Sequence, residues 1–163
     1  MAESWRIKRL RWRFNWYPAF RRTGARVVHI AEDLSEATVR LPLNAATRNI
    51  HGTIYGGAMY AAVDPVHAVL LGARLGPAYE VWMKAAAIEF KRPGRSDLFA
   101  HAHVPVEEVS EVRRRLTNEP KVDRAYSLAL AHADGEVAAV FQLTLHVRRR
   151  ETAPAVPEGD FPV

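Results

Sequence analysis

The chain has 163 residues, of which 48% are apolar and 25% charged, and this fits one globular domain with a substantial core. It has no cysteine, which excludes disulfides, thiolate metal sites and a cysteine nucleophile and is compatible with the cytoplasmic location that we expect. The formal net charge is +5, but residues 1–26 hold eight basic side chains and one acid, so the remainder is slightly acidic. A nucleic-acid-binding protein is therefore not expected, and the basic segment points to a local role.

The first predicted element is a helix over residues 4–17. Its tryptophans share one side, and its other apolar residues share the opposite side: Trp5, Trp12 and Trp16 against Ile7, Leu10, Phe14 and Tyr17. A helix with two apolar faces needs two partners. One is the body of the protein. For the other, a second subunit is favoured, and an acyl chain or a membrane surface remains an alternative.

The rest of the chain predicts an α+β fold in which an antiparallel sheet wraps around one long central helix. The predicted helix is Ala58–Leu75, which is apolar on all sides but too polar for a membrane span. Strands are predicted at Arg26–Ala31, Ala37–Leu43, Val81–Phe90, Leu98–Val106, Val122–Ala133 and Glu136–Arg148, with a charged helix or excursion at Glu107–Leu116. The expected organisation is a basic amphipathic helix at 1–20, the main domain at 21–150 and a poorly ordered, proline-rich tail at 151–163.

The chemistry is expected in Asn49–Asp64. Gly56 and Gly57 open the central helix, whose first backbone N–H groups have no intrahelical acceptor and lie at the positive end of the helix dipole. Such donors suit a carbonyl oxygen that becomes negative during acyl transfer. Asp64 follows Gly57 by two helical turns, and a carboxylate in this apolar setting is costly unless it is used or caps the helix. Because Asp followed by Pro is a favoured helix start, Asp64 as a helix cap remains open.

The spacing of these residues is similar to that of hotdog-fold acyl-CoA thioesterases of the phenylacetyl-CoA and hydroxybenzoyl-CoA type. The shared pattern joins Asn49, Gly52-Thr53, Gly56-Gly57 and Ala58 to Asp64. More closely, residues 14–148 resemble a group of uncharacterised hotdog proteins known only as a domain of unknown function. The resemblance lies in Asn15–Pro18, Leu41–Asn44, Thr47–Asn49, Gly56-Gly57, Asp64-Pro65, Val81–Lys84 and Arg92–Arg95.

The resemblance implies a role for each matching residue. The Gly57 N–H would polarise the thioester carbonyl, Asp64 would act as nucleophile or general base, and Asn49 would orient water or the thioester. The site would lie between two subunits of a homodimer, possibly within a tetramer. The substrate would be an acyl-CoA or similar thioester, with coenzyme A as part of the substrate and no other cofactor. Basic residues expected to bind the CoA phosphates are Arg92, Arg95 and Arg148–Arg150.

Further residues are expected near the substrate: Gly56, His51 and Lys84. The thioesterases carry His where this chain has Tyr55, and a tyrosine can donate a hydrogen bond but cannot act as a base near neutral pH. A non-catalytic hotdog protein that binds an acyl thioester or serves in assembly is therefore an alternative, and a hydratase or dehydratase ranks last. His67 could pair with Asp64, whereas His101 and His103 are expected to face solvent rather than bind metal.

Overall fold

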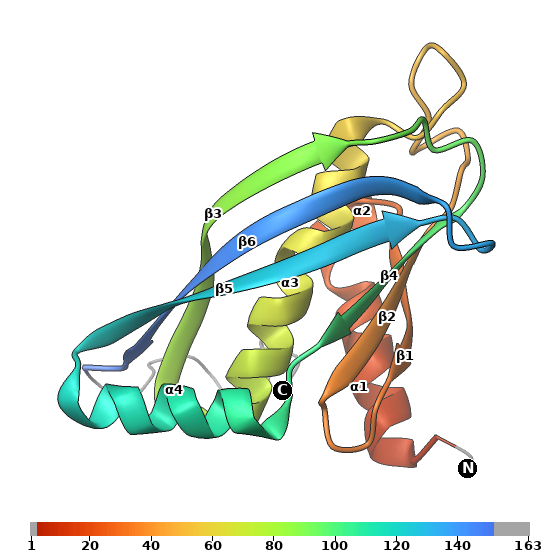
Figure 1. Ribbon diagram of the computed structural model, residues 1–163. Helices are drawn as coiled ribbons and strands as arrows, with labels where there is room; N and C mark the ends of the chain where they lie inside the picture. Colours follow the sequence, from red (N-terminus) through yellow and green to blue (C-terminus); the bar gives the residue numbers. More distant parts are fainter. Residues whose placement is uncertain (1–2, 152–163) are drawn as a thin grey trace.

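The computed structural model describes residues 3–151. Along this part of the chain, pairs of strands are separated by helices, and all the strands join one sheet (Figure 1). The elements are α1 (Trp5–Trp16), α2 (Pro18–Arg22), β1 (Arg26–Ile30), β2 (Glu36–Leu41), α3 (Gly56–Leu75), β3 (Tyr79–Phe90), β4 (Leu98–His103), α4 (Val106–Asn118), β5 (Lys121–Ala131) and β6 (Val137–Arg149). Every strand and both long helices predicted from the sequence are present, and the charged excursion is a helix. The predicted tail beyond residue 151 lies outside the described residues.

The six strands form one antiparallel sheet in the order β1-β2-β4-β5-β6-β3, and the sheet curves around α3 (Figure 1). This is the predicted architecture. The hairpin between β5 and β6 turns at Asp134-Gly135, an Asp-Gly pair of the kind that favours such turns, and Gly135 adopts a φ of 91°. The turn after β3 is not a hairpin, because β3 pairs with β6 whereas β4 lies between β2 and β5.

The core fills the space between α3 and the inner face of the sheet. Alternating residues of β6 face inward and are buried: Ala139, Phe141, Leu143, Leu145 and Val147. They belong to the same apolar cluster as Val63, Val66 and Leu70 of α3. Each large side chain buried in this way stabilises the fold by about 1.5–3 kcal/mol. None of the helices within residues 3–151 is long and apolar enough to cross a membrane.

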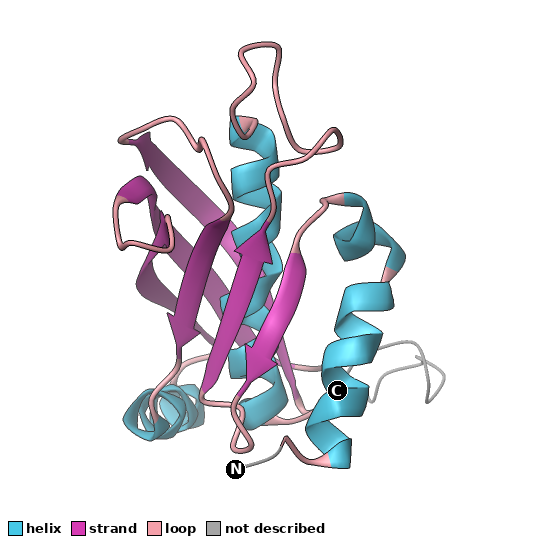
Figure 2. Cartoon of the chain, turned by 90° about the vertical axis from the view of Figure 1, so that its right-hand side faces the viewer, coloured by secondary structure: helices cyan, strands magenta, loops and turns pink. Residues whose placement is uncertain are grey.

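Helix α1 lies beside β1 at one edge of the sheet (Figure 2). Ser4 caps it by accepting a hydrogen bond from the Ile7 N–H, and the side that meets the body is the one with Ile7 and Phe14, which are buried. The three tryptophans instead face outward, with 72%, 60% and 51% of Trp5, Trp12 and Trp16 exposed. Tyr17, which the spacing grouped with Ile7 and Phe14, follows the last helical residue and is exposed.

Asn15 joins α1 to the backbone of β1. Its side-chain amide accepts a hydrogen bond from the Val27 N–H at 2.8 Å and donates one to the Val27 carbonyl at 2.9 Å. One side chain thus satisfies both backbone groups of Val27 at the outer edge of the sheet. An edge strand exposes such groups to pairing with other chains, so Asn15 also protects this edge.

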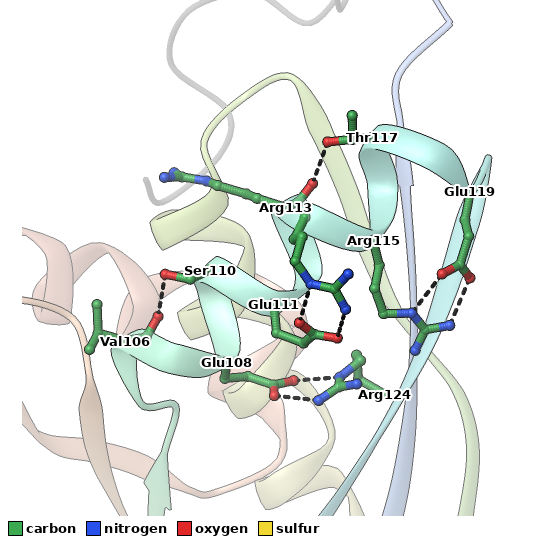
Figure 3. A network of polar contacts seen from close by, with 10 residues as sticks. Val106, Glu108, Ser110, Glu111, Arg113, Arg115, Thr117, Glu119 and Arg124 are labelled. Atoms are coloured by element: carbon green, nitrogen blue, oxygen red, sulfur yellow. Dashed lines mark hydrogen bonds and ion pairs between the residues drawn. The ribbon is translucent and has the colours of Figure 1, made fainter.

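Helix α4 closes the sheet at the end where α3 finishes. Val109, Val112 and Leu116 give it a buried side. Its charged side is tied to β5, because Arg124 donates two hydrogen bonds to the Glu108 carboxylate at 2.6 and 2.7 Å (Figure 3). Burial raises the pKa of Glu108, but the hydrogen bonds from Arg124 and Tyr126 outweigh it and leave this pKa below its usual value. Glu108 is therefore ionised, and this partly buried ion pair fixes α4 to the sheet.

Candidate active site

The first turn of α3 presents free backbone donors. Ala58 and Met59 both donate their N–H groups to the Tyr55 carbonyl at 3.0 and 3.1 Å. Within residues 3–151 the N–H groups of Gly56 and Gly57 donate to no backbone carbonyl, and Tyr55 provides no side-chain cap. These two donors therefore remain available to a ligand at the positive end of the helix dipole.

The backbone before this turn is held from two sides. The Tyr55 N–H donates to the Thr47 carbonyl at 2.8 Å, and the Ile54 N–H donates to the Gly94 carbonyl at 2.9 Å. Gly94 belongs to the loop between β3 and β4. The helix N-terminus and the Arg92–Arg95 segment are therefore held together, and their relative position is set by main-chain hydrogen bonds.

Two aromatic rings lie against the pair of glycines at this turn. A Cβ at Gly56 would lie 2.9 Å from the Phe90 ring, and a Cβ at Gly57 would lie 2.4 Å from the Tyr55 ring. Both distances are shorter than side chains tolerate. The Tyr55 ring thus lies directly against Gly57, and since it is 61% exposed it has room to swing aside. This places the predicted Tyr55 beside the predicted oxyanion donor.

Asp64 lies in the interior of α3 and is held by a tyrosine one turn before it. The Tyr60 hydroxyl donates a hydrogen bond to Asp64 Oδ1 at 3.0 Å. Burial, and then this hydrogen bond, raise the pKa of Tyr60, so its proton stays on the phenol at neutral pH. The interpretation of Asp64 as a helix cap was wrong, because the helix runs without interruption from Gly56 to Leu75.

The separation of Gly57 and Asp64 limits what one chain can do. Seven residues at 1.5 Å each place them about 10 Å apart along the helix axis. A nucleophile must come within about 3–3.5 Å of the carbonyl carbon whose oxygen the donor holds. A single α3 therefore cannot act with both groups on one carbonyl.

One side of the molecule offers a surface for a second copy of the chain. Strand β3 pairs with β6 on one side and with no strand of the described residues on the other. Ala85, Ala86, Ala87 and Phe90 on this edge are exposed. On α3, which packs against β3, one side carries residues three or four positions apart that are among those not fully buried: Gly57, Ala61, Asp64 and Ala68. A long, unprotected apolar edge is typical of strands that pair with another chain.

A depression of about 480 Å³, lined by two arginines and two acids among other residues, opens beside the segment that leads into α3. Its lining combines the loop after β3 with the β5–β6 hairpin: Arg92, Pro93, Arg95, Ser96, His132, Ala133, Asp134 and Glu136. Arg92 pairs with Glu136 at 3.0 Å, whereas no acidic side chain within residues 3–151 pairs with Arg95. Arg95 is thus the cation in this depression that remains available to an anionic ligand. Arg148, by contrast, pairs with Glu80 at the far end of β6.

Asn49 holds the loop that precedes α3. Its side-chain oxygen accepts hydrogen bonds from the N–H groups of His51 and Thr53 at 2.9 and 3.2 Å, and its amide donates to the Thr53 hydroxyl at 3.0 Å. These contacts occupy the amide within the loop. His51 lies in the same loop with an exposed side chain. The predicted roles of both residues toward substrate remain predictions.

Lys84 lies apart from the other predicted site residues. It forms an ion pair with Asp123, which also binds the His146 ring at 2.7 Å. Asp123 alternates along β5 with the buried Val122, so this cluster lies on the face of the sheet that points away from α3. Nothing in this arrangement supports a role for Lys84 in binding substrate.

His67 does not pair with Asp64. It is 2% exposed, its Nδ1 atom has no hydrogen-bond partner, and its ring stacks on Tyr126 at 4.8 Å. Burial lowers its pKa to about 4. His101 and His103 are exposed, as predicted, and no group of three metal-binding side chains is present within residues 3–151.

A protein-family model described as "Domain of unknown function (DUF4442)" matches residues 8–157. The chain belongs to this family. A comparison with curated proteins finds no match. The family assignment agrees with the resemblance inferred from the sequence.

Solved structures place this DUF4442 chain among hotdog proteins. It is similar to a Pseudomonas aeruginosa protein of unknown function described as a probable thioesterase, with a TM-score of 0.80 and 21% identity over 88% of this chain and 95% of that chain. It is also similar to a thioesterase from Haemophilus influenzae, with a TM-score of 0.70 and 16% identity over 92% and 95% of the two chains. Identities this low establish the hotdog fold, and the activity must be argued from the site.

Proposed function

We propose that the protein is an acyl-CoA thioesterase whose active site is completed by a homodimer. The observation that carries the proposal is the arrangement on α3, where free Gly56 and Gly57 N–H groups lie two turns from the carboxylate of Asp64. The thioesterase relatives of the same fold support this class of reaction. We also propose that the protein acts in the cytoplasm.

The proposed reaction begins with the thioester carbonyl oxygen on the Gly57 N–H of one subunit. Asp64 of the other subunit removes a proton from water, which attacks the carbonyl carbon, or attacks that carbon itself to give an anhydride that water opens. The carbon–sulfur bond breaks, the sulfur takes up a proton, and the products are a carboxylic acid and coenzyme A. Tyr60 is a positioning residue, because its hydroxyl holds Asp64 Oδ1.

The proposed dimer pairs the free edges of two β3 strands in antiparallel fashion. This pairing would continue the sheet and bring two α3 helices side by side. The carboxylate near the middle of one helix would then approach the N-terminus of the other. A tetramer would require a further contact between two such dimers.

The coenzyme part of the substrate is assigned to the depression beside the segment that leads into α3. Its phosphates would meet Arg95, with Arg92 nearby. The hydrogen bond from Ile54 to Gly94 holds this loop against the segment that leads into α3. A phosphate bound there would therefore keep the thioester close to Gly57.

A non-catalytic binder of acyl thioesters is the second candidate. The observation that favours it is the Tyr55 ring, which lies against Gly57 and takes the place where related thioesterases carry His. A ring that stays in this position would shield the oxyanion donor. Such a protein would hold an acyl-CoA without cleaving it.

Thiol release from short, medium, long and aromatic acyl-CoAs separates the two candidates. Turnover by the native protein that is lost in Asp64→Asn supports the thioesterase. A folded protein that retains intact acyl-CoA in native mass spectrometry, without turnover on any substrate, supports the binder.

A further inference from the structure

The outer side of α1 is a basic surface with tryptophans at its centre. Trp5, Trp12 and Trp16 share this side, and the Trp12 and Trp16 rings lie 5.8 Å apart. The guanidinium of Arg9 lies over Trp5 at 5.5 Å, and that of Arg21 lies over Trp16 at 4.3 Å. We refer to a set of exposed residues on this outer side as the tryptophan face: Trp5, Arg6, Lys8, Arg9, Trp12, Trp16 and Arg21.

The tryptophan face carries four cations, Arg6, Lys8, Arg9 and Arg21, and no acid of its own. No acidic residue occurs anywhere in residues 5–22. The two acids near the start of the helix are already engaged, since Glu3 pairs with Arg11 and Glu32 accepts hydrogen bonds from Ser4. Exposed cations flank the tryptophans on both sides, with Lys8 on one side and Arg6 and Arg9 on the other.

The fold leaves this face open even in a dimer built on β3. Helix α1 packs against β1, and β1 and β3 are opposite edges of the sheet (Figure 1). Pairing through β3 would therefore leave one tryptophan face at each end of the dimer. The inner side of α1 is buried, so the helix lies flat on the body with its whole length exposed outward.

The same charge opposes contact between two copies of this face. A two-fold interface would bring the Arg6, Lys8 and Arg9 of one copy toward those of the other, and residues 5–22 contain no acid to offset this repulsion. An acyl chain is also a poor occupant, because a convex helix surface cannot enclose it. Tryptophans flanked by cations on a helix that lies flat match the boundary of an anionic bilayer, where indole rings enter the headgroup layer and cations meet acidic lipids.

We propose that the tryptophan face docks the protein on the surface of an anionic membrane. The helix would lie in the plane of the interface, with Trp5, Trp12 and Trp16 inserted among headgroups and the flanking cations on lipid phosphates. This inference does not depend on thioesterase activity. It would place the protein where amphiphilic acyl compounds gather.

Vesicle sedimentation and fluorescence test the docking directly. The probes are phosphatidylcholine vesicles with and without roughly one third phosphatidylglycerol. The full chain should bind the anionic vesicles at least about tenfold more strongly than the neutral ones. The Trp82→Phe variant retains only the three α1 tryptophans, so its emission should shift to shorter wavelength on binding. A variant with Phe at positions 5, 12 and 16 retains only Trp82 and should show no shift.

Two variants with intact inner faces decide whether α1 is responsible. Lys8→Glu/Arg9→Glu and Trp12→Ser/Trp16→Ser should each lower vesicle affinity at least about tenfold, whereas the charge-matched Lys91→Glu/Lys121→Glu should bind like the native chain. Circular dichroism checks that each variant is folded. Absence of binding at low salt, or equal binding by the α1 variants, overturns the proposal. A lower molecular mass of Trp12→Ser/Trp16→Ser would also overturn it, since the face would then join two copies.

Discussion

The Tyr60 hydroxyl donates its hydrogen bond to Asp64 along one side of α3, and this contact fixes the carboxylate without neutralising it. No cation pairs with Asp64 among the described residues. Asp64 is only partly buried and is held by one hydroxyl through Oδ1, so its other oxygen is available for water. This hydrogen bond therefore favours Asp64 as a general base over a carboxylate with a purely structural role.

Removal of the Asp64 charge should abolish turnover. Asp64→Asn is expected to lower kcat by about 10²–10⁴-fold, because the amide cannot accept a proton from water. Tyr60→Phe should lower kcat by only about tenfold, with little change in KM, because one orienting hydrogen bond of about 1.4 kcal/mol is lost. Steady-state kinetics with the best acyl-CoA measures both. Equal loss in the two variants would contradict a mere positioning role for Tyr60.

The oxyanion donor has a closely matched pair of variants. Gly57→Pro removes the N–H yet fits the first helical turn, whereas Gly57→Ala keeps the N–H and displaces the Tyr55 ring in the same way. We expect Gly57→Pro to lose about 10²–10³-fold in kcat and Gly57→Ala to lose much less. Similar losses in both would assign the effect to Tyr55 rather than to the donor.

Mixing inactive subunits tests whether the site spans the dimer. In a heterodimer of Asp64→Asn and Gly57→Pro, one of the two sites has an intact Asp64 and an intact Gly57 if they come from different chains. After random exchange of subunits, half of the dimers are mixed, so activity should recover to about a quarter of the native value. A site contained in one chain would recover nothing, because every chain carries one defect.

The dimer edge can be tested with a single charge. Ala86 lies near the middle of β3, so in an antiparallel β3 pair it would lie close to its own copy, and Ala86→Glu would oppose two carboxylates. We expect light scattering to show a shift toward the 18.3 kDa monomer. Ala129→Glu, on an exposed position of β5, is the control and should remain dimeric. Unchanged mass in both variants would place the interface elsewhere.

The phosphate assignment can be tested with a truncated substrate. Arg95→Ser is expected to raise KM for acyl-CoA about tenfold, since a charge-assisted hydrogen bond contributes about 1.5–3 kcal/mol. The same acyl group on pantetheine, which has no phosphates, should show no change in KM. If KM rises equally for both substrates, Arg95 instead stabilises the fold of its loop.

The patterns in the sequence were sufficient for the architecture. Ala58–Leu75 is apolar on every side, and only a helix wrapped by other elements accommodates that composition. The alternation along Glu136–Arg148 and the turn at Asp134-Gly135 predicted a hairpin that the structure contains. The order of the strands in the sheet could not be predicted from the sequence. That β3 is an edge strand follows only from the pairing of β6 with both β3 and β5.

Contacts between distant segments could not be predicted from the sequence. The pairing of Asn15 with Val27 and the tie between Ile54 and Gly94 join residues whose separation along the chain carries no signal. Tyr60 could have been found, since a tyrosine four residues before an aspartate shares its side of a helix. Lys84 was assigned to the substrate because its strand is apolar, but alternation places it on the outer face beside Asp123.

His67 should make the stability of the protein depend on pH. Its pKa is about 4 in the folded chain, because burial disfavours the charged ring, and about 6.5 when unfolded. Between these values the unfolded chain binds a proton that the folded chain does not, so stability falls as pH decreases from about 6.5 to about 4. At pH 5 the linkage costs about 2 kcal/mol relative to pH 7.5. His67→Leu keeps an apolar contact with Tyr126 and removes this titration. Urea unfolding at pH 7.5 and pH 5 measures the free energy of unfolding of both proteins. Relative to the native chain, the variant should gain about 2 kcal/mol when the pH is lowered to 5. A difference between the two proteins that does not change with pH would show that His67 stays accessible to protons.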